Sequence, residues 1–194
     1  VVGHKSYSLE NRTIKKTQPL KFDVNAIAPG YTVDKLALLF DRFKLKHYMI
    51  ELSGEIVCKG QNLQGMDWLI GIETPNFNQV QGNSLEKIVK LNNKALSTSG
   101  DYRHFYQIEG KIYAHTIDSR TGEPAQHNLA SVSVIANSCM EADAVARTLM
   151  VMGKYSGLVC LKTYDSDVDA YFITRTDSGF SEFYTPNFKS YIKE

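Results

Sequence analysis

Residues 138–153 constrain the fold of this chain more than any other segment. Ser138 and Glu141 form the S-x-x-E pattern of a capping box, which predicts that a helix begins at Ser138. Gly153 is expected to end that helix, because glycine readily adopts the left-handed backbone that closes a helix. The run Ala-Ser-Val-Ser-Val-Ile-Ala at residues 130–136 precedes the helix and is typical of a strand. A strand followed by a capped helix indicates a fold that combines sheet and helix.

The rest of the chain consists mainly of short strand-like segments and turns. Apolar residues recur at helical spacing over residues 33–43, after a loop at 23–30, and a short helix is expected over 155–163. Strands are expected in the segments 6–21 (strand, turn, strand), 47–52, 55–59, 68–73, 85–91, 94–98, 101–107, 111–117, 168–175 and 179–184. Because several of these strands are joined by tight turns, the sequence predicts an α+β fold with a largely antiparallel sheet and packed helices. The length suits a single domain, 1–194.

Composition excludes several classes of function. The net charge is +1 and no long basic block occurs, so the electrostatic footprint of a nucleic-acid-binding protein is absent. No apolar run approaches the roughly 20 residues that span a membrane, so no transmembrane segment is expected. The three cysteines are widely separated, which favours ordinary packing over a zinc site.

The chain begins Val1-Val2-Gly3, which indicates a fragment, a processed product or a trimmed sequence. No pattern indicates an oligomeric state.

Asp143 is the first candidate for chemistry, because it lies in the opening turns of the predicted helix. One interpretation is a carboxylate that complements the positive end of the helix dipole. The other is a ligand for a hard cation such as Mg²⁺, which binds oxygen atoms and keeps several waters. The positive helix end also attracts anions, so a site for a phosphate-bearing ligand and a cation is expected here.

His115 and Arg120 belong to a second candidate segment, His-Thr-Ile-Asp-Ser-Arg-Thr-Gly at residues 115–122. His115 is either a hydrogen-bonded histidine at the end of a strand, or a general base or phosphate ligand. Arg120 could bind a phosphate through two hydrogen bonds, or it could pair with its close neighbour Asp118.

Six collinear segments resemble the motifs of the ApbE-type flavin transferases, also called FAD:protein FMN transferases. Each motif is modest alone, but six in the same order along nearly the whole chain are specific. The segments are residues 23–34 (family motif DLxAIAKGYAVD), 52–55 (LGGE), 68–75 (WxIGIExP), 97–102 (ATSGDY), 115–122 (HIIDPRTG) and 141–153 (xADALATALxVMG). The resemblance implies the C-terminal part of an ApbE-like, T-fold-like domain from a longer parent protein.

The resemblance implies an enzyme that transfers FMN from FAD to a threonine hydroxyl of a target flavoprotein, with release of AMP and dependence on Mg²⁺. FAD and the acceptor flavoprotein would be its partners. The parent would act in the bacterial cell envelope, either in the periplasm or anchored to lipid. By the same resemblance, the residues with roles are the catalytic His115, the FAD-binding Asp23, Pro29, Gly30 and Ile117, and the metal ligands Ala26 (through its carbonyl), Asp143 and Thr148.

One departure from the family pattern concerns the metal. The family helix usually carries a threonine four residues after the aspartate, but here Arg147 occupies that position and Thr148 follows it. At about 100° per residue, Arg147 lies about 40° around the helix from Asp143, whereas Thr148 lies about 140° around. Thr148 could therefore reach the ion only through a helix bulge, while Arg147 could pair with Asp143. We expect weakened or lost metal binding, which a titration of Mg²⁺ against the wild type and Arg147→Thr would test.

Two alternatives stay open. Arg147, together with Pro29 in place of a polar family residue, favours a non-catalytic or degenerate flavin-binding module. The other alternative is a metal-dependent FAD pyrophosphatase, which hydrolyses FAD to FMN and AMP without an acceptor protein.

Overall fold

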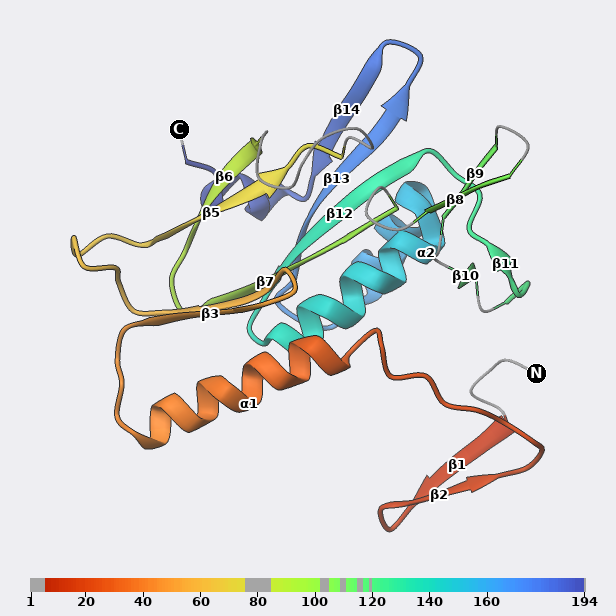
Figure 1. Ribbon diagram of the computed structural model, residues 1–194, viewed down its shortest axis with the longest axis horizontal. Helices are drawn as coiled ribbons and strands as arrows, with labels where there is room; N and C mark the ends of the chain where they lie inside the picture. Colours follow the sequence, from red (N-terminus) through yellow and green to blue (C-terminus); the bar gives the residue numbers. More distant parts are fainter. Residues whose placement is uncertain are drawn as a thin grey trace.

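A six-stranded sheet forms the centre of the computed structural model, which describes residues 6–75, 85–101, 105–108, 111–114, 117–118 and 120–193 (Figure 1). The strand order is β14-β13-β12-β7-β4-β3, and every neighbouring pair is antiparallel. The strands are β3 (Tyr48–Leu52), β4 (Glu55–Lys59), β7 (Lys94–Gly100), β12 (Leu129–Ala136), β13 (Asp169–Thr176) and β14 (Gly179–Tyr184). The predicted α+β fold with a largely antiparallel sheet is therefore confirmed.

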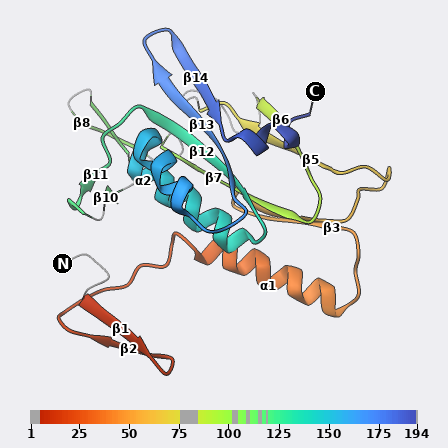
Figure 2. The same cartoon turned by 180° about the vertical axis from the view of Figure 1, so that it is seen from behind.

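Short two-stranded sheets and helices complete the described part of the fold. The paired strands are β1 (Tyr7–Glu10) with β2 (Thr13–Lys16), β5 (Trp68–Glu73) with β6 (Leu85–Leu91), β8 (Phe105–Ile108) with β9 (Lys111–Ala114), and β10 (Ile117–Asp118) with β11 (Glu123–Pro124). The helices are α1 (Ala28–Arg42), α2 (Cys139–Thr163) and the 3-10 helix η2 (Pro186–Tyr191). Figures 1 and 2 both show the β1–β2 hairpin set apart from the central sheet, beyond the N-terminal end of α1.

The central sheet buries side chains on both of its faces. On one face, Val132 and Val134 of β12 pack against the apolar side of α2. On the other face, Ile135 and Tyr171 pack with residues of β5 and β6 and with Phe188 of η2. Each of these five side chains is at most 1 % exposed, and full burial of such a side chain contributes about 1.5–3 kcal/mol. Because side chains pack against both faces of the sheet, β12 is buried at all eight positions, although serine and valine alternate along it.

α2 begins and breaks where local sequence chemistry predicts. The hydroxyl of Ser138 accepts a hydrogen bond from the Glu141 N–H at 3.3 Å, as in a capping box. Gly153 has φ 73 and a non-helical backbone, so α2 consists of two helical stretches on either side of it. A Cβ atom at Gly153 would lie 2.9 Å from the ring of His127, whose Nε2 lies 2.7 Å from the Met150 carbonyl oxygen. The predicted helix break at this glycine is therefore confirmed.

α2 is also, among the described residues, the one helix long and apolar enough to cross a membrane, with a mean hydropathy of 1.2 in its most apolar window. In this fold the helix lies on β12 and β7 and packs against α1. Leu149 and Met150, near its middle, are each 1 % exposed. The core helix of a folded domain meets the same length and composition criterion.

α1 begins earlier than the sequence predicts. The residues up to Gly30 were expected to form a loop, but the helix begins at Ala28 with Ile27 as its N-cap. Pro29 is compatible with this start, because proline suits the first turn of a helix, where its missing N–H is not needed. Gly30 is then helical and packs on α2, where a Cβ atom would lie 2.5 Å from the Cys139 carbonyl oxygen. The glycine therefore allows the two helices to approach closely.

Some short elements lie outside what the sequence predicts. β10, β11 and η2 are too short to produce a periodic pattern. β8 begins at Phe105, although the predicted strand began at Asp101. The prediction of a single domain stays a prediction.

Candidate functional site

Asp143 joins the two helices at the centre of the candidate site. Its Oδ2 accepts a hydrogen bond of 3.1 Å from the Gly30 N–H, across a sequence separation of 113 residues. The Asp143 side chain is 2 % exposed. Burial raises the pKa of its carboxyl above the ordinary value, because desolvation disfavours the charged form; the Gly30 N–H and the charge of Arg147 oppose this rise. Two predicted site residues, Gly30 and Asp143, are thus in direct contact.

The N-terminus of α2 is already occupied by a carboxylate of the protein. Asp34 on α1 accepts hydrogen bonds from the N–H groups of Cys139 (2.8 Å) and Met140 (2.9 Å). Together with Ser138, which accepts from Glu141, it satisfies the N–H groups that a helix otherwise offers to an anion. The expectation that this helix end attracts a phosphate-bearing ligand is therefore corrected: the anion there is Asp34.

The N-terminus of α1 is satisfied internally as well. The Ala28 N–H donates to the Val24 carbonyl at 2.9 Å, Pro29 has no N–H, and the Gly30 N–H donates to Asp143. Neither helix end therefore presents a row of open backbone donors, and a phosphate near Asp143 would need other groups to bind it.

Arg147, rather than Thr148, shares the helix face of Asp143. Within α2 the backbone departs from helical geometry only at Gly153, so no bulge rotates Thr148 towards Asp143. The Thr148 hydroxyl donates to the Ala144 carbonyl at 2.8 Å, and the side chain is exposed. Arg147 lies one turn after Asp143, and its charge lowers the pKa of that carboxyl. The structure does not bring Thr148 and Asp143 together, and their metal-binding roles stay predictions.

Asp23 and Ala26 lie on the segment that leads into α1. Asp23 is exposed, and its Oδ1 accepts from the Asn25 N–H at 2.8 Å, which closes an Asx turn. Ala26 is half-buried in the turn directly before the helix. Both are therefore only a few residues from Pro29, which is half-buried, and from the Gly30–Asp143 contact. Their predicted contacts with FAD and metal are not tested by these positions.

The β10 turn forms a separate, local ion pair. Arg120 donates to Asp118 from its backbone N–H (2.8 Å), from Nε (3.0 Å) and from Nη2 (2.7 Å). These hydrogen bonds, with the charge of Arg120, lower the pKa of Asp118 to about 2. The structure therefore supports the interpretation of Arg120 as a partner of Asp118 rather than as a phosphate ligand. Ile117 is 49 % exposed next to this pair, and β10 contacts α2.

His115, the predicted catalytic residue, lies outside the described residues. Its role stays a prediction that rests on the motif at residues 115–122. Within the described ranges, no group of three or more His, Cys, Asp or Glu side chains is arranged to hold a metal ion. As far as the described residues go, a cation near Asp143 would depend on backbone carbonyls, water or the ligand.

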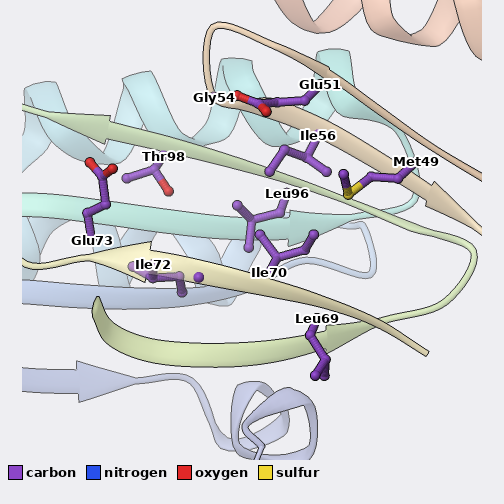
Figure 3. A pocket seen from close by; sticks show the side chains of 11 residues that line it. Met49, Glu51, Gly54, Ile56, Leu69, Ile70, Ile72, Glu73, Leu96 and Thr98 are labelled. Carbon is purple, nitrogen blue, oxygen red and sulfur yellow. The ribbon is translucent and has the colours of Figure 1, made fainter. Parts of the chain in front are cut away.

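A cavity of about 250 Å³ lies on the other side of the central sheet, between the sheet and β5 (Figure 3). Apolar side chains such as Ile70 and Leu96 line it together with polar groups, and Glu73 and Thr98 lie near each other at one end. The volume is below the roughly 300–1,000 Å³ of typical ligand pockets. The lining residues are Met49, Glu51, Gly54, Ile56, Leu69, Ile70, Gly71, Ile72, Glu73, Leu96 and Thr98, and none is a predicted site residue.

A second cavity, of about 400 Å³, lies beside α1 and reaches Asp34 and Ser138 at the start of α2. Its two lysines are already paired, since Lys59 lies 2.6 Å from Asp41 and Lys94 lies 2.6 Å from Asp167. The sequence predictions did not identify Asp34 as the residue that caps α2. The sequence feature that could have drawn attention to Asp34 is its position as the last residue of the motif at residues 23–34.

The comparisons with known proteins point to one family. The ApbE family model matches residues 1–172. The chain is 35% identical over 195 residues to the FAD:protein FMN transferase of Vibrio cholerae serotype O1, covering 100% of this chain and 57% of that protein. It is 38% identical over 172 residues to the Haemophilus influenzae protein of the same name, covering 88% and 49%.

The fold agrees with that family. The structure of the Pseudomonas stutzeri flavinyl transferase ApbE, in its apo form, matches with a TM-score of 0.84 and 33% sequence identity. The match covers 97% of this chain and 57% of that chain. The present chain thus spans about half the length of the curated relatives it matches.

Proposed function

Because this chain belongs to the ApbE family, we propose that it takes part in the transfer of FMN from FAD to a threonine hydroxyl of an acceptor flavoprotein, with release of AMP. The named relatives are FAD:protein FMN transferases. The observation that carries the proposal is the Gly30–Asp143 contact, because it joins two of the family's motifs, residues 23–34 and 141–153, into one buried junction.

The proposed reaction is a phosphoryl-type transfer. The threonine oxygen attacks the FMN-side phosphorus of FAD, the bond to the bridging oxygen breaks, and AMP leaves with that oxygen. The threonine proton passes to a base, for which His115 is the proposed residue. Such a transfer depends on positioning the reacting groups and on neutralising the phosphate charge. The helix junction supplies a rigid frame for positioning, since Asp34 and Asp143 hold α1 and α2 together.

Magnesium is the cation that the family resemblance implies, with Asp143, Ala26 and Thr148 as ligands. The described residues do not fit a ready divalent site. Asp143 has one oxygen bonded to Gly30, Thr148 is directed to the Ala144 carbonyl, and Arg147 places a positive charge on the helix face of Asp143. The proposed steps therefore involve no metal ion.

A direct assay separates the proposed function from its alternatives. The chain is incubated with FAD and an acceptor flavoprotein domain that carries a target threonine, with Mg²⁺ or with EDTA. Fluorescent acceptor on a denaturing gel, absent when the acceptor threonine is changed to alanine, is the expected result. AMP release without labelled acceptor would indicate the pyrophosphatase. FAD that binds but stays intact would indicate a flavin-binding module, which is the candidate that Arg147 beside Asp143 favours.

We also propose a location in the bacterial cell envelope for the full-length parent, in the periplasm or anchored to lipid. The support is the family resemblance alone. Fractionation of cells that express the tagged parent protein tests it, and recovery of the protein in the cytoplasmic fraction would contradict it.

A further inference from the structure

β3 is an edge strand of the central sheet, and its outer side is open. It is the last strand in the order β14-β13-β12-β7-β4-β3, and within the described ranges no strand pairs with that side. A two-residue turn at 53–54, with positive φ at both residues, joins β3 to β4 and makes Leu52 and Glu55 a hydrogen-bonded pair. Because such pairs alternate along an antiparallel ladder, the N–H and C=O groups of Met49 and Glu51 point away from β4. β3 therefore offers backbone donors and acceptors to a further strand.

The flank of α1 that lies beyond β3 carries exposed apolar side chains. α1 packs on β3 and β4, whereas α2 packs mainly on β7 and β12, and the two helices lie side by side (Figures 1 and 2). Gly30 and Asp34 face α2. At about 100° per residue, Leu36, Leu39 and Phe43 lie on the opposite flank, which is the one beyond the edge strand. They are 39, 43 and 71 % exposed, and apolar side chains gathered in this way mark an interaction surface.

The charges beside β3 differ between its two ends. Lys44 and Lys46 are exposed just before the strand, and Glu51 is exposed near its far end. Among the described residues, none of the three has an ion-pair partner. A second β3 that runs antiparallel to the first places each Glu51 towards the basic end of the other copy, whereas a parallel strand would place the two Glu51 residues together. Opposite charges stabilise a strand pair and like charges destabilise it, so the charges favour an antiparallel second copy.

We propose that two copies of this chain associate through their β3 strands, antiparallel, with Ile50 of each copy facing Ile50 of the other on a two-fold axis. In this register Met49 of one copy and Glu51 of the other exchange their outward hydrogen bonds. The two central sheets become one continuous sheet, and the exposed flank of α1 faces the same flank of the other copy. The same surface is used by both copies, as in most symmetric dimers. One contact thus covers both the open edge and the apolar flank, and it does not depend on the proposed function.

Analytical ultracentrifugation of the intact chain measures the association. The wild type should change from monomer to dimer between about 1 µM and 1 mM. Met49→Pro removes an outward N–H, which an edge strand tolerates, and should weaken the dimer roughly tenfold, because each dimer loses two hydrogen bonds. Phe43→Asp should weaken it by roughly tenfold or more, because the interface would take a carboxylate out of water. Circular dichroism shows whether each variant is folded.

A charge exchange tests the antiparallel direction. Glu51→Lys and Lys46→Glu should each weaken the dimer by roughly threefold to tenfold, because each dimer loses two exposed charge pairs. The double variant Glu51→Lys/Lys46→Glu should recover most of the wild-type affinity. Glu123→Lys makes the same charge change at an exposed position on β11, away from β3, and should leave the affinity unchanged.

Cysteine cross-linking tests the register. Chains with Met49→Cys and chains with Glu51→Cys, both also carrying Cys160→Ser, are mixed and oxidised. The mixture should form a disulfide-linked dimer, because the Cα atoms of a hydrogen-bonded pair lie about 5.5 Å apart, within the range of a disulfide. Neither variant should form it alone.

Three results would overturn the proposal. The first is a wild type that stays monomeric over the whole concentration range, which needs no variant and so holds even if one fails to fold. The second is a dimer that none of the changes in β3 and α1 weakens, because the copies would then associate through another surface. The third is cross-linking within the single cysteine variants but not in their mixture, which would contradict the antiparallel register.

Discussion

Asp143 and Asp118 are two carboxylates whose surroundings move their pKa values in opposite directions. Burial between α1 and α2 raises the pKa of Asp143. Hydrogen bonds from Arg120 lower the pKa of Asp118 to about 2. Asp143 accepts a hydrogen bond from Gly30, which is 113 positions away, whereas Asp118 accepts hydrogen bonds from Arg120, which is two positions away.

The contrast shows that the same side chain has different chemistry in a tertiary junction and in a local turn. In the junction, loss of water outweighs the Gly30 N–H and the charge of Arg147, so burial decides the direction of the pKa shift. In the turn, the Arg120 side chain is 65% exposed and its guanidinium group aligns with the carboxylate, so pairing dominates. Substitutions in the two regions should therefore differ in size and in their dependence on pH.

The largest effect is expected for Gly30→Ala. A Cβ atom would lie 2.5 Å from the Cys139 carbonyl oxygen, so one helix must shift, and we expect the free energy of unfolding to fall by about 3 kcal/mol. The matched change in the local turn is Gly122→Ala, where φ is 78 but no atom lies within 4 Å of the added carbon. Its cost should be about 1–2 kcal/mol, from backbone strain alone. Urea denaturation of both variants measures the difference, and equal losses would contradict the close helix contact.

Asp34→Ala should have the next largest effect. The change removes the acceptor for the Cys139 and Met140 N–H groups, and we expect the free energy of unfolding to fall by about 1–2 kcal/mol, as for other lost helix caps. Asp34→Asn keeps one side-chain acceptor and should recover part of this loss. Urea denaturation again provides the measurement, and an unchanged midpoint for Asp34→Ala would show that the cap contributes nothing.

The two carboxylates should also give opposite pH profiles. Because the folded pKa of Asp143 is raised, its ionisation costs stability; the cost is absent below the ordinary value of 3.8 and grows as pH rises above it. Asp143→Asn should therefore gain stability relative to the wild type as pH increases from about 3.8. The folded pKa of Asp118 is lowered, so its contribution is present above 3.8 and is lost as pH falls towards about 2.

Denaturation of both asparagine variants from acidic to neutral pH tests this expectation. Asp118→Asn should be less stable than the wild type at neutral pH, and the difference should vanish in acid. Profiles of the same sign for the two variants would contradict the assignment of burial to one site and pairing to the other.

The smallest effect is expected for Thr148→Ala. The side chain is exposed and its hydroxyl bonds only to a carbonyl of its own helix, so the free energy of unfolding should change by less than about 0.5 kcal/mol. Urea denaturation measures the change, and a loss of stability above about 1 kcal/mol would show that Thr148 does more than bond within its own helix.

The outcome of the sequence predictions follows the range of the interactions involved. The helix start capped by Ser138 and the break at Gly153 were predicted correctly, because each depends on residues within one or two turns. The pairing of Asp118 with Arg120 was one of two interpretations, and the structure selected it. The early start of α1 was missed, because a proline in the first turn resembles loop sequence.

The amino-acid sequence by itself determined most of the longer strands and helices, the α+β class and the family, since periodicity, caps and collinear motifs are all local or ordered along the chain. Only the tertiary structure decided that Asp34 fills the N-terminus of α2, and that Asp143 is buried against Gly30. Those contacts span more than 100 residues. They arise because α1 and α2 pack against each other. That packing removes Asp143 from water and places Asp34 against the backbone N–H groups of α2.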